Sequence, residues 1–562
     1  MKLLELRPDR ALLKPNFDGY KLSLEPIPVL RTELTEPSRP DHVRPGEQQY
    51  SCLHAQLFGL QNHLVRDPWA AGSSYFVDQS WIVRRVQYDE ASGRLKPVSS
   101  VFKIGRNRGA RRDGDYNCSL VFLSEKFALI ADGQGGLLLV ETGDRQRGDE
   151  WKGKFSFPDV DGLDGGFVLA DGRFEIISGE RQIHAICVCV QHKEPAFEIV
   201  IHWLKAVQVE PSQEWKYHSQ RVLSGKGFPS YCALEPKGGS LVLVSDNPFK
   251  FILDTENPIE PEIVTAEVNG ESDTNNETFP FDWTQTMDDI TIKIPKEEGV
   301  NYKITNDDGK LKIFRNEELV IDGECFFALV DSELTSWTNE SSELVVSLFK
   351  QQSGVMWPFL FPGSAEETRD GAVDEMPPVS NLASQLEDCD FGITGQDAEY
   401  TIERLSLASH ETTHKVFLGS NAPLFTVCLR PGFPAALALR HDVDACLWLQ
   451  QAGTDWSLRH EGTLHAFGYV QASKQQRKFL TCSPDLDYAV ICEAERHVFI
   501  YKASYGTASG LRNRNGPQVT IGQQQLVALE GSGEILGICC ENDYTVLLTE
   551  KQILVLQLRI EE

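Results

Sequence analysis

The residues most suggestive of metal binding or acid–base catalysis form the tetrapeptide His441-Asp442-Val443-Asp444. An imidazole beside two carboxylates could hold a metal ion or act as a general base. If the tetrapeptide is a strand, however, successive side chains point to opposite faces, and His441 is then separated from both aspartates. A polar residue that fixes a turn between two strands is the favoured interpretation, and no metal site is predicted.

Signatures of hydrolases and nucleotide-binding enzymes are missing. The sequence has no G-x-S-x-G, no Gly-Lys-Ser/Thr and no G-x-G-x-x-G. The glycine-rich stretch from Asp132 to Gly136 joins two predicted strands, so it cannot aim a helix N-terminus at a phosphate. We predict a protein that is not an enzyme and binds no cofactor. A propeller hydrolase with a site assembled from dispersed residues remains an alternative.

Thirteen cysteines are scattered along the chain, mostly within apolar stretches. None of them is spaced as C-x-x-C, the spacing of zinc knuckles and thioredoxin-like sites. This distribution predicts reduced, buried thiols. The cysteines are Cys52, Cys118, Cys187, Cys189, Cys232, Cys325, Cys389, Cys428, Cys446, Cys482, Cys492, Cys539 and Cys540.

The composition indicates a soluble protein of the cytoplasm and nucleus. Of its 562 residues 41% are hydrophobic, and the formal net charge of −28 disfavours direct binding to nucleic acids and anionic membranes. Leucines alternate with charged residues from Met1 to Lys14, unlike a signal peptide. The longest apolar run, Ile183 to Val190, is much too short to span a bilayer.

Although the chain is acidic overall, it contains one run of basic residues that is interrupted by glycine. It could contact RNA or serve as a nuclear address, which is why an RNA-associated nuclear scaffold is a second alternative. No aromatic residues alternate with it, as stacking on single strands would require, so a solvated loop is favoured. Its residues are Lys103, Arg106, Arg108, Arg111 and Arg112, and a weaker cluster comprises Lys474, Arg477 and Lys478.

Short β-rich runs joined by polar turns recur along the chain. Their centres fall near residues 82, 133, 187 and 240, and again near 442, 492 and 546, a period of about 50 residues that is typical of propeller blades. The sequence therefore predicts an all-β fold with a propeller of about seven blades, although six or eight are also compatible. Tyr20 to Leu24 is the predicted strand that closes the ring on the last blade.

The period is interrupted between the fourth and fifth hairpins. Residues 254–278 and 362–400 are acidic and contain prolines, as linkers do. Residues 279–361 contain about seven short strands, such as the alternating Ile290, Ile292 and Ile294, and predict an antiparallel β-sandwich. The propeller would then consist of residues 1–253 and 401–562.

The inserted unit resembles the CS domain of the NudC family. The resemblance rests on Phe281-x-Trp283-x-Gln285-Thr286-x-x-Asp289-Ile290-Thr291-Ile292, Gly323-Glu324, Ser336-Trp337-Thr338, Leu344 to Lys350 and Trp357-Pro358. Three further segments extend the resemblance to nearly the whole chain: Asn16 to Pro26, Leu439 to Ala445 and Gly468 to Lys474.

What this resemblance implies is protein binding without catalysis. NudC proteins act as co-chaperones, often with the ninety-kilodalton heat-shock chaperone and with clients that contain propellers. The chain lacks the sustained heptads of a coiled coil, so a monomer is expected. We predict a co-chaperone-like adaptor whose CS sandwich and propeller each bind protein partners.

Within the predicted sandwich, large apolar residues divide into core and surface candidates. The expected core contains Trp283, Ile292, Trp337 and Leu348. The expected protein-binding edge, after the last strand, contains Trp357, Pro358 and Phe359, because exposed aromatic side chains anchor partners.

Overall fold

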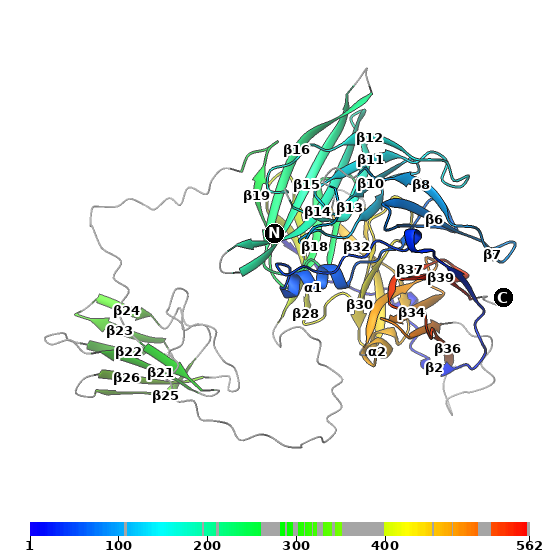
Figure 1. Ribbon diagram of the computed structural model, residues 1–562. Helices are drawn as coiled ribbons and strands as arrows, with labels where there is room; N and C mark the ends of the chain where they lie inside the picture. Colours follow the sequence, from blue (N-terminus) through cyan, green and yellow to red (C-terminus); the bar gives the residue numbers. More distant parts are fainter. Residues whose placement is uncertain are drawn as a thin grey trace. The chain divides into compact units, whose positions relative to one another are not determined.

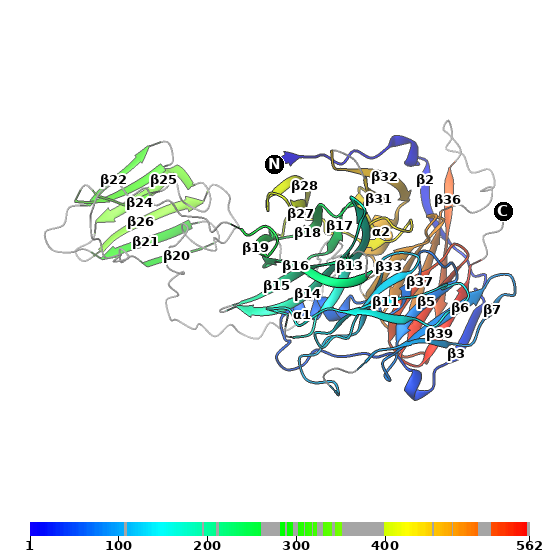
Figure 2. The same ribbon diagram turned by 90° about the horizontal axis from the view of Figure 1, so that it is seen from above.

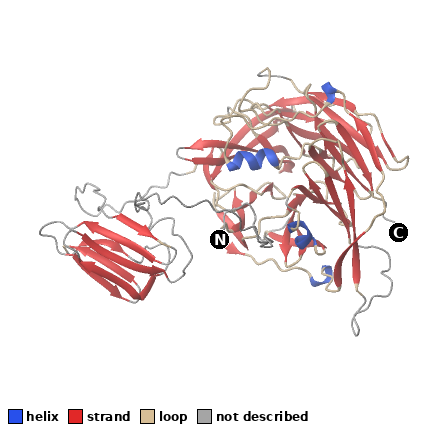
Figure 3. Ribbon diagram, turned by 60° about the horizontal axis from the view of Figure 1, so that its bottom comes forward, coloured by secondary structure: helices blue, strands red, loops and turns tan. Residues whose placement is uncertain are grey.

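The computed structural model consists mostly of strands and has few helices (Figure 3). It divides into a large unit, Met1–Glu262 with Glu387–Glu562, and a small unit, Ile263–Leu386. Figure 1 labels the elements. The structure describes residues 1–105, 109–163, 165–193, 196–209, 213–259, 282–286, 289–295, 302–307, 310–316, 318–322, 330–339, 343–350, 398–451, 455–474, 476–503 and 519–558.

In its described residues the large unit contains seven sheets, whose strands pair mainly antiparallel. Seven clusters of buried apolar side chains join each sheet to the next, and one of them joins the seventh sheet back to the first. A closed circle of sheets that cover one another's faces is a β-propeller. The predicted fold class is therefore confirmed.

We number the sheets in the order in which the chain passes through them after the N-terminal strands β1 (Lys2–Leu3), β2 (Phe17–Leu22) and β3 (Val29–Glu33). Sheet 1 has β4 (Val65–Arg66), β5 (Ser73–Val77), β6 (Ile82–Asp89), β7 (Arg94–Leu95) and β8 (Ser99–Lys103). Sheet 2 has β9 (Ser119–Phe122), β10 (Phe127–Ala131), β11 (Leu137–Glu141) and β12 (Lys152–Ser156). Sheet 3 has β13 (Val168–Ile177), β14 (Glu180–Lys193), β15 (Ala196–Val209), β16 (Glu214–Gly225) and β19 (Lys250–Asp254).

Three of the remaining four sheets include a strand from the N-terminus. Sheet 4 has β17 (Tyr231–Leu234), β18 (Ser240–Ser245), β27 (Tyr400–Ser406), β28 (Thr412–Gly419) and β1 (Lys2–Leu3), and sheet 5 has β29 (Phe425–Val427), β30 (Ala436–His441), β31 (Asp444–Gln451) and β32 (Ser457–Leu464). Sheet 6 has β33 (Arg477–Cys482), β34 (Tyr488–Glu493), β35 (His497–Lys502), β36 (Thr520–Ala528) and β2 (Phe17–Leu22), and sheet 7 has β37 (Ile535–Cys540), β38 (Tyr544–Thr549), β39 (Gln552–Gln557) and β3 (Val29–Glu33).

The insert interrupts a sheet rather than a connection between sheets. Strand β18 ends at Ser245 and β27 begins at Tyr400, yet the two pair antiparallel, with Ser240 opposite Ser406. Strand β19, just after β18, pairs with β16 of the preceding sheet. Sheet 4 is thus completed only when the chain returns from the insert.

The ring is closed by a different strand from the predicted one. Tyr20 lies in β2, which pairs parallel with β36 on the outside of sheet 6. The last sheet is completed by β3, antiparallel to β39, with Val29 opposite Leu556 (Figure 2). The alternation of Tyr20, Leu22 and Leu24 predicted a strand but could not identify its neighbour, and Leu22 and Leu24 are in fact exposed.

One predicted hairpin is misplaced. The run Ile183 to Val190 was expected to contain the centre of a hairpin near residue 187, but it lies inside the 14-residue strand β14. Its partner is β15, another 14-residue strand, which pairs with it from Gln182–Val207 to Lys193–Ala196. Because both faces of this part of β14 are buried against neighbouring sheets, its apolar run is continuous instead of alternating.

Helices occur only in connections of the described chain. Helix α1 (Cys52–Gly59) precedes sheet 1, with Ser51 accepting a bond from the His54 amide as its N-cap, and α2 (Phe467–Ala472) joins sheets 5 and 6. The 3₁₀ helices are η1 (Arg10–Leu12) and η2 (Glu36–Ser38).

The small unit has seven strands in two sheets among its described residues. Alternate residues of β21, Ile290, Ile292 and Ile294, are buried, as expected for a sheet with one covered face. One sheet has the order β20 (Asp282–Gln285), β21 (Asp289–Pro295), β26 (Glu343–Lys350) and β25 (Val330–Asn339), and the other has β22 (Tyr302–Asp307), β23 (Lys310–Arg315) and β24 (Glu318–Asp322).

Candidate functional site

Three of the four residues expected in the core of the small unit are buried. Trp283 is 1% exposed, and Ile292 and Leu348 are fully buried. Trp283 pairs with Ile292 across β20 and β21, and Lys350 extends along the base of the sheet to the side chain of Gln285 and the carbonyl of Thr286.

Trp337 departs from the prediction that it is a core residue, since 45% of it is exposed. Its partner across the strands is the buried Val346, so the tryptophan lies on the covered face of the sheet. Strand β25, however, is at the edge of that sheet and its register shifts between Asp331 and Ser336. Because Trp337 lies on an edge strand beside a bulge, part of its indole is exposed and can contact a partner.

The predicted protein-binding edge lies outside the described residues. The structure gives no placement for Trp357, Pro358 or Phe359. Their role stays a prediction.

Part of the basic run is structural instead of solvated. The guanidinium of Arg111 pairs with the carboxylate of Asp41, donates to the Asp132 carbonyl at 2.8 Å, and lies 4.6 Å from the centre of the Trp81 ring. Burial of Asp41 explains why a cation is needed there. Lys103 and Arg112 are exposed, whereas Arg106 and Arg108 lie outside the described residues.

The tetrapeptide His441 to Asp444 is a turn and not a strand. His441 ends β30, Asp444 begins β31, and Asp442 has a left-handed φ of 50° between them. The Asp444 carboxylate accepts the Ala466 amide at 2.6 Å and lies 3.8 Å from the His465 ring. Asp444 therefore fixes the start of α2, which agrees with the structural interpretation of this motif.

The sequence contains one H-E-x-x-H pattern, His410 to His414, which the search for catalytic motifs in the sequence did not identify. In zinc peptidases this spacing places both histidines on one face of a helix. Here His410 lies in the turn between β27 and β28 and His414 lies within β28. Nε2 of His410 bonds to Asp254 at 2.9 Å, and that of His414 lies 3.3 Å from Asp455, so the pattern forms no joint metal site.

The same aspartate anchors the insert. Asp254, at the end of β19, also accepts from Nε of the buried Arg221 at 2.9 Å. Two residues further on, Glu256 bonds to Lys205 at 3.0 Å, and these cations lower the pKa of Glu256 to about 2. Arg221, the single arginine of β16, was the sequence signal for this network, which fixes the chain at the start of the first linker.

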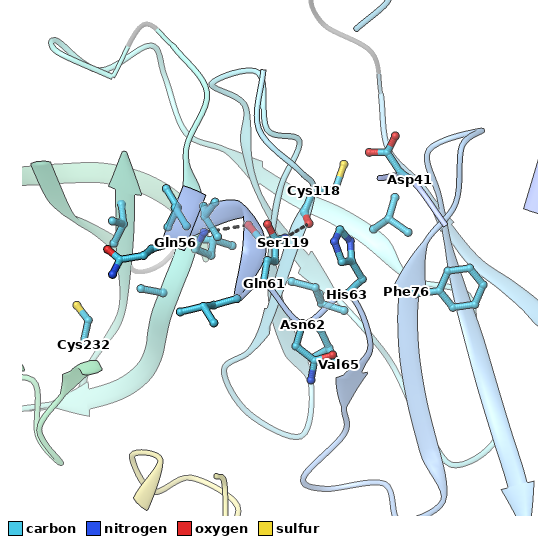
Figure 4. Close-up of a pocket in the computed structure, with 18 of the residues that line it drawn as sticks. Asp41, Gln56, Gln61, Asn62, His63, Val65, Phe76, Cys118, Ser119 and Cys232 are labelled. Carbon is cyan, nitrogen blue, oxygen red and sulfur yellow. Dashed lines mark hydrogen bonds between the residues drawn. The ribbon is translucent and has the colours of Figure 1, made fainter. Parts of the chain in front are cut away.

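A cavity of about 250 Å³ lies among α1 and the strands of sheets 1 to 4 (Figure 4). Gln61 donates to the Cys118 carbonyl at 2.9 Å and Asn62 to the Ile538 carbonyl at 2.7 Å, so these amides hold the loop after α1. Figure 4 shows Cys118 and Cys232 on separate elements.

Burial shifts the pKa of three groups that line this cavity. Burial lowers the pKa of His63 to about 3, and burial raises the pKa of the Cys118 and Cys232 thiols. A thiol is a poor nucleophile until it ionises.

Among the described residues, one group has the composition of a metal site. His42, Glu534 and Glu550 place one ligand atom each within 4.8 Å of one another. Lys478, however, donates to Glu534 at 2.8 Å and already neutralises that carboxylate. The arrangement thus resembles a polar ion-pair network more than a vacant cation site.

Two sequence predictions concern thiols and membranes. No disulfide is formed among the described cysteines, most of which are buried. In the described part of the chain, no helix combines the length and the apolar character needed to cross a membrane.

The fold and these surfaces define a β-propeller protein that carries a β-sandwich within one of its sheets. Residues 279–350 match the CS domain family. Over 99% of both chains, the sequence is 30% identical to NudC domain-containing protein 1 of Mus musculus, and over 98% of both chains it is 29% identical to that of Xenopus laevis. The chain belongs to the family of NudC domain-containing protein 1.

Two solved structures show limited similarity to this chain. A nuclear movement protein from E. cuniculi is 26% identical and covers 14% of this chain and 96% of its own, with a TM-score of 0.13. The propeller domain of Cps50 (Swd1) from Myceliophteria thermophila is 9% identical and covers 89% of this chain and 100% of its own, with a TM-score of 0.32.

Proposed function

We propose that this protein is a non-enzymatic, co-chaperone-like adaptor of the cytoplasm and nucleus. Its CS sandwich would bind one protein and its propeller another. The observation that carries the proposal is the CS domain, folded as a unit of its own between two segments that complete one propeller.

The organisation of the chain supports two binding activities in one molecule. The small unit has its own buried core, so it can present its surface without unfolding the propeller. A partner that binds one unit is then held near a partner of the other at a high effective concentration. Clients with propellers and the ninety-kilodalton heat-shock chaperone are the partners that we propose.

Affinity purification from cells tests this function. Partners of the intact chain are compared with those of a chain in which a flexible linker replaces residues 263–386, and with those of the Trp337→Ala variant. We expect the replacement to remove one set of partners and to leave a second set bound to the propeller, with Trp337→Ala weakening only the first set. Identical partners in all three purifications would contradict the adaptor proposal.

A further inference from the structure

The negative charge of the chain is concentrated in the insert. Residues 254–400 contain 33 of the 82 acidic residues but only 8 of the 54 lysines and arginines, so they carry −25 of the net charge of −28. The remaining 415 residues, which form the propeller, carry only −3. The propeller is therefore close to neutral and can present a positive surface, which the charge of the whole chain conceals.

Such a surface surrounds helix α2. Its three cations are Arg440, Lys474 and Arg477, and no ion pair with a carboxylate is found for them among the described residues. Arg440 donates to the carbonyl of Asp442 at 3.0 Å, and Arg477 donates to the carbonyls of Gln471 and Lys474, each at 3.2 Å. Nζ of Lys474 lies 4.4 Å from the centre of the Phe499 ring, so all three charges are held in place without a carboxylate partner among the described residues.

Two exposed side chains lie within this group of cations. Tyr469, in α2, is 64% exposed, and Val443, in the turn between β30 and β31, is 52% exposed. The two are neighbours, because the Tyr469 amide donates to the Val443 carbonyl at 3.0 Å. An exposed tyrosine among arginines is the composition of residues that dominate protein interfaces.

The backbone below these side chains is held firmly. Asp444 binds the Ala466 amide, and Ala466 has a left-handed φ of 53°. A side chain on Gly468 would come within 2.6 Å of the Asp444 carbonyl, so only glycine allows this close approach. Tyr20, from the N-terminal strand β2, donates its hydroxyl to the carbonyl of His465. Strained residues held by several partners are common at binding sites.

Both parts of the surface leave the propeller at the same end. In an antiparallel sheet, the turn between the second and third strands and the connection after the fourth strand are on one side. Val443 lies in the former and α2 in the latter for sheet 5, and Figures 1 and 2 show α2 beside the strands of sheets 5 and 6. The exposed tyrosine, valine and cations thus lie at one end of the propeller, together with the exposed carboxylate of Asp442.

We propose that this patch, the α2 surface formed by Arg440, Val443, Tyr469, Lys474 and Arg477, binds an acidic peptide segment of a partner protein. The segment would place a large apolar side chain against Tyr469 and Val443 and its carboxylates against the three cations. Charge complementarity selects this partner, because carboxylates can replace the missing counter-ions. This proposal extends the proposed function. It rests on one part of that function, namely that the propeller binds a protein.

Fluorescence anisotropy with the full-length chain tests the α2 surface. The probe is a fluorescein-labelled peptide with glutamates on both sides of one tryptophan, and the control peptide has lysines in place of the glutamates. We expect Tyr469→Ala and Lys474→Glu each to weaken binding of the acidic probe at least about tenfold. Lys216→Glu, an exposed control in β16, should leave it unchanged. Higher salt should weaken the binding.

Three outcomes would overturn the proposal. These are equal affinity of all variants, equal binding of the lysine peptide, and binding that appears only after the acidic residues of 363–399 are changed to amides. The last would identify the chain's own linker as the occupant. Thermal unfolding of each variant checks that the propeller remains folded. If cellular proteins still bind the propeller of Tyr469→Ala at full strength, the α2 surface is wrong while the adaptor function stands.

Discussion

Buried charges in the propeller are neutralised by partners from other parts of the chain. Arg145, in the loop between β11 and β12, bonds to Asp67, in the loop between β4 and β5, at 2.6 Å, and both side chains are nearly inaccessible to solvent. Arg221 and Asp254 form a similar pair within sheet 3. Loss of one member would leave an uncompensated buried charge, which is far more costly than loss of an exposed pair. Such residues are structural even where they resemble functional ones.

The two tryptophans of the small unit should respond differently to truncation. Trp283→Ala should destabilise the unit by about 3–5 kcal/mol, because it leaves a large cavity. Trp337→Ala should cost only about 1 kcal/mol, because nearly half of its surface is already exposed. Hydrogen exchange of peptides from residues 282–350 in the full-length protein measures both. If Trp337→Ala lowered the stability of the unit as much as Trp283→Ala, Trp337 would be a core residue as first predicted.

Acidification should destabilise the propeller through a buried histidine. His184 accepts a bond from the Trp203 indole at 3.0 Å, and burial lowers its pKa from 6.5 to about 3. Since the folded pKa lies below the unfolded one, the unfolded chain binds the proton first as pH falls. Stability should therefore decrease below about pH 6.5, by up to roughly 1.4 kcal/mol per pH unit for this residue.

The contribution of His184 can be isolated by substitution. His184→Gln keeps an acceptor for Trp203 but does not titrate, so its stability should depend less on pH than that of the unmodified protein. Denaturant unfolding at pH 7 and pH 5 provides the comparison. Equal losses for both proteins would mean that other groups cause the acid sensitivity.

Among the elements, the N-terminal segment has an unusual course. Strand β1 pairs with sheet 4, β2 with sheet 6 and β3 with sheet 7, while the Asp9 amide between β1 and β2 donates to His460 of sheet 5. About 30 residues thus contact four neighbouring sheets. Only β3 completes a sheet of four strands, whereas β1 and β2 are fifth strands on the outside.

Removal of β3 should therefore be much more damaging than removal of the strands before it. A chain without residues 1–26 keeps Val29 and Leu30, which pack against the clusters on both sides of sheet 7. We expect it to unfold at a slightly lower temperature. A chain without residues 1–34 exposes the β39 edge and should lose the cooperative propeller transition in calorimetry. Equal melting temperatures for the two deletions would show that β3 does not close the ring.

At the scale of the whole molecule, each unit has buried apolar residues of its own among the residues that the structure describes. Each buried cluster of the propeller is composed of residues outside the insert, and β27 re-forms sheet 4 as though the insert were a turn. The insert begins just after the Asp254 network and returns before Tyr400. Independent folding of the units follows from this arrangement.

Replacement of residues 263–386 by a flexible linker of about 20 residues should leave the propeller intact. Calorimetry should show that one transition disappears and that the propeller transition shifts by no more than about 2 °C, since β18 and β27 can still pair. The double variant with Asp254→Asn is the control, because it removes an anchor of the propeller itself and should lower that transition. A large shift from the replacement alone would show that the insert stabilises the ring.

The sequence by itself determined the β-propeller class, the interruption near residue 254 and the strands of the CS unit. These depend on local alternation and on a period of about 50 residues, which are visible in one chain. It even placed the hairpin of β34 and β35 correctly.

Only the tertiary structure decided which strands pair, because pairing depends on neighbours that are distant in sequence. In the structure, β3 closes the ring in place of the segment around Tyr20, and Trp337 is exposed at a sheet edge. Arg111 pairs with the buried carboxylate of Asp41. The α2 surface belongs to the same class of result: Val443 and Tyr469 are separated by a strand pair in the sequence, and a single backbone hydrogen bond brings them together.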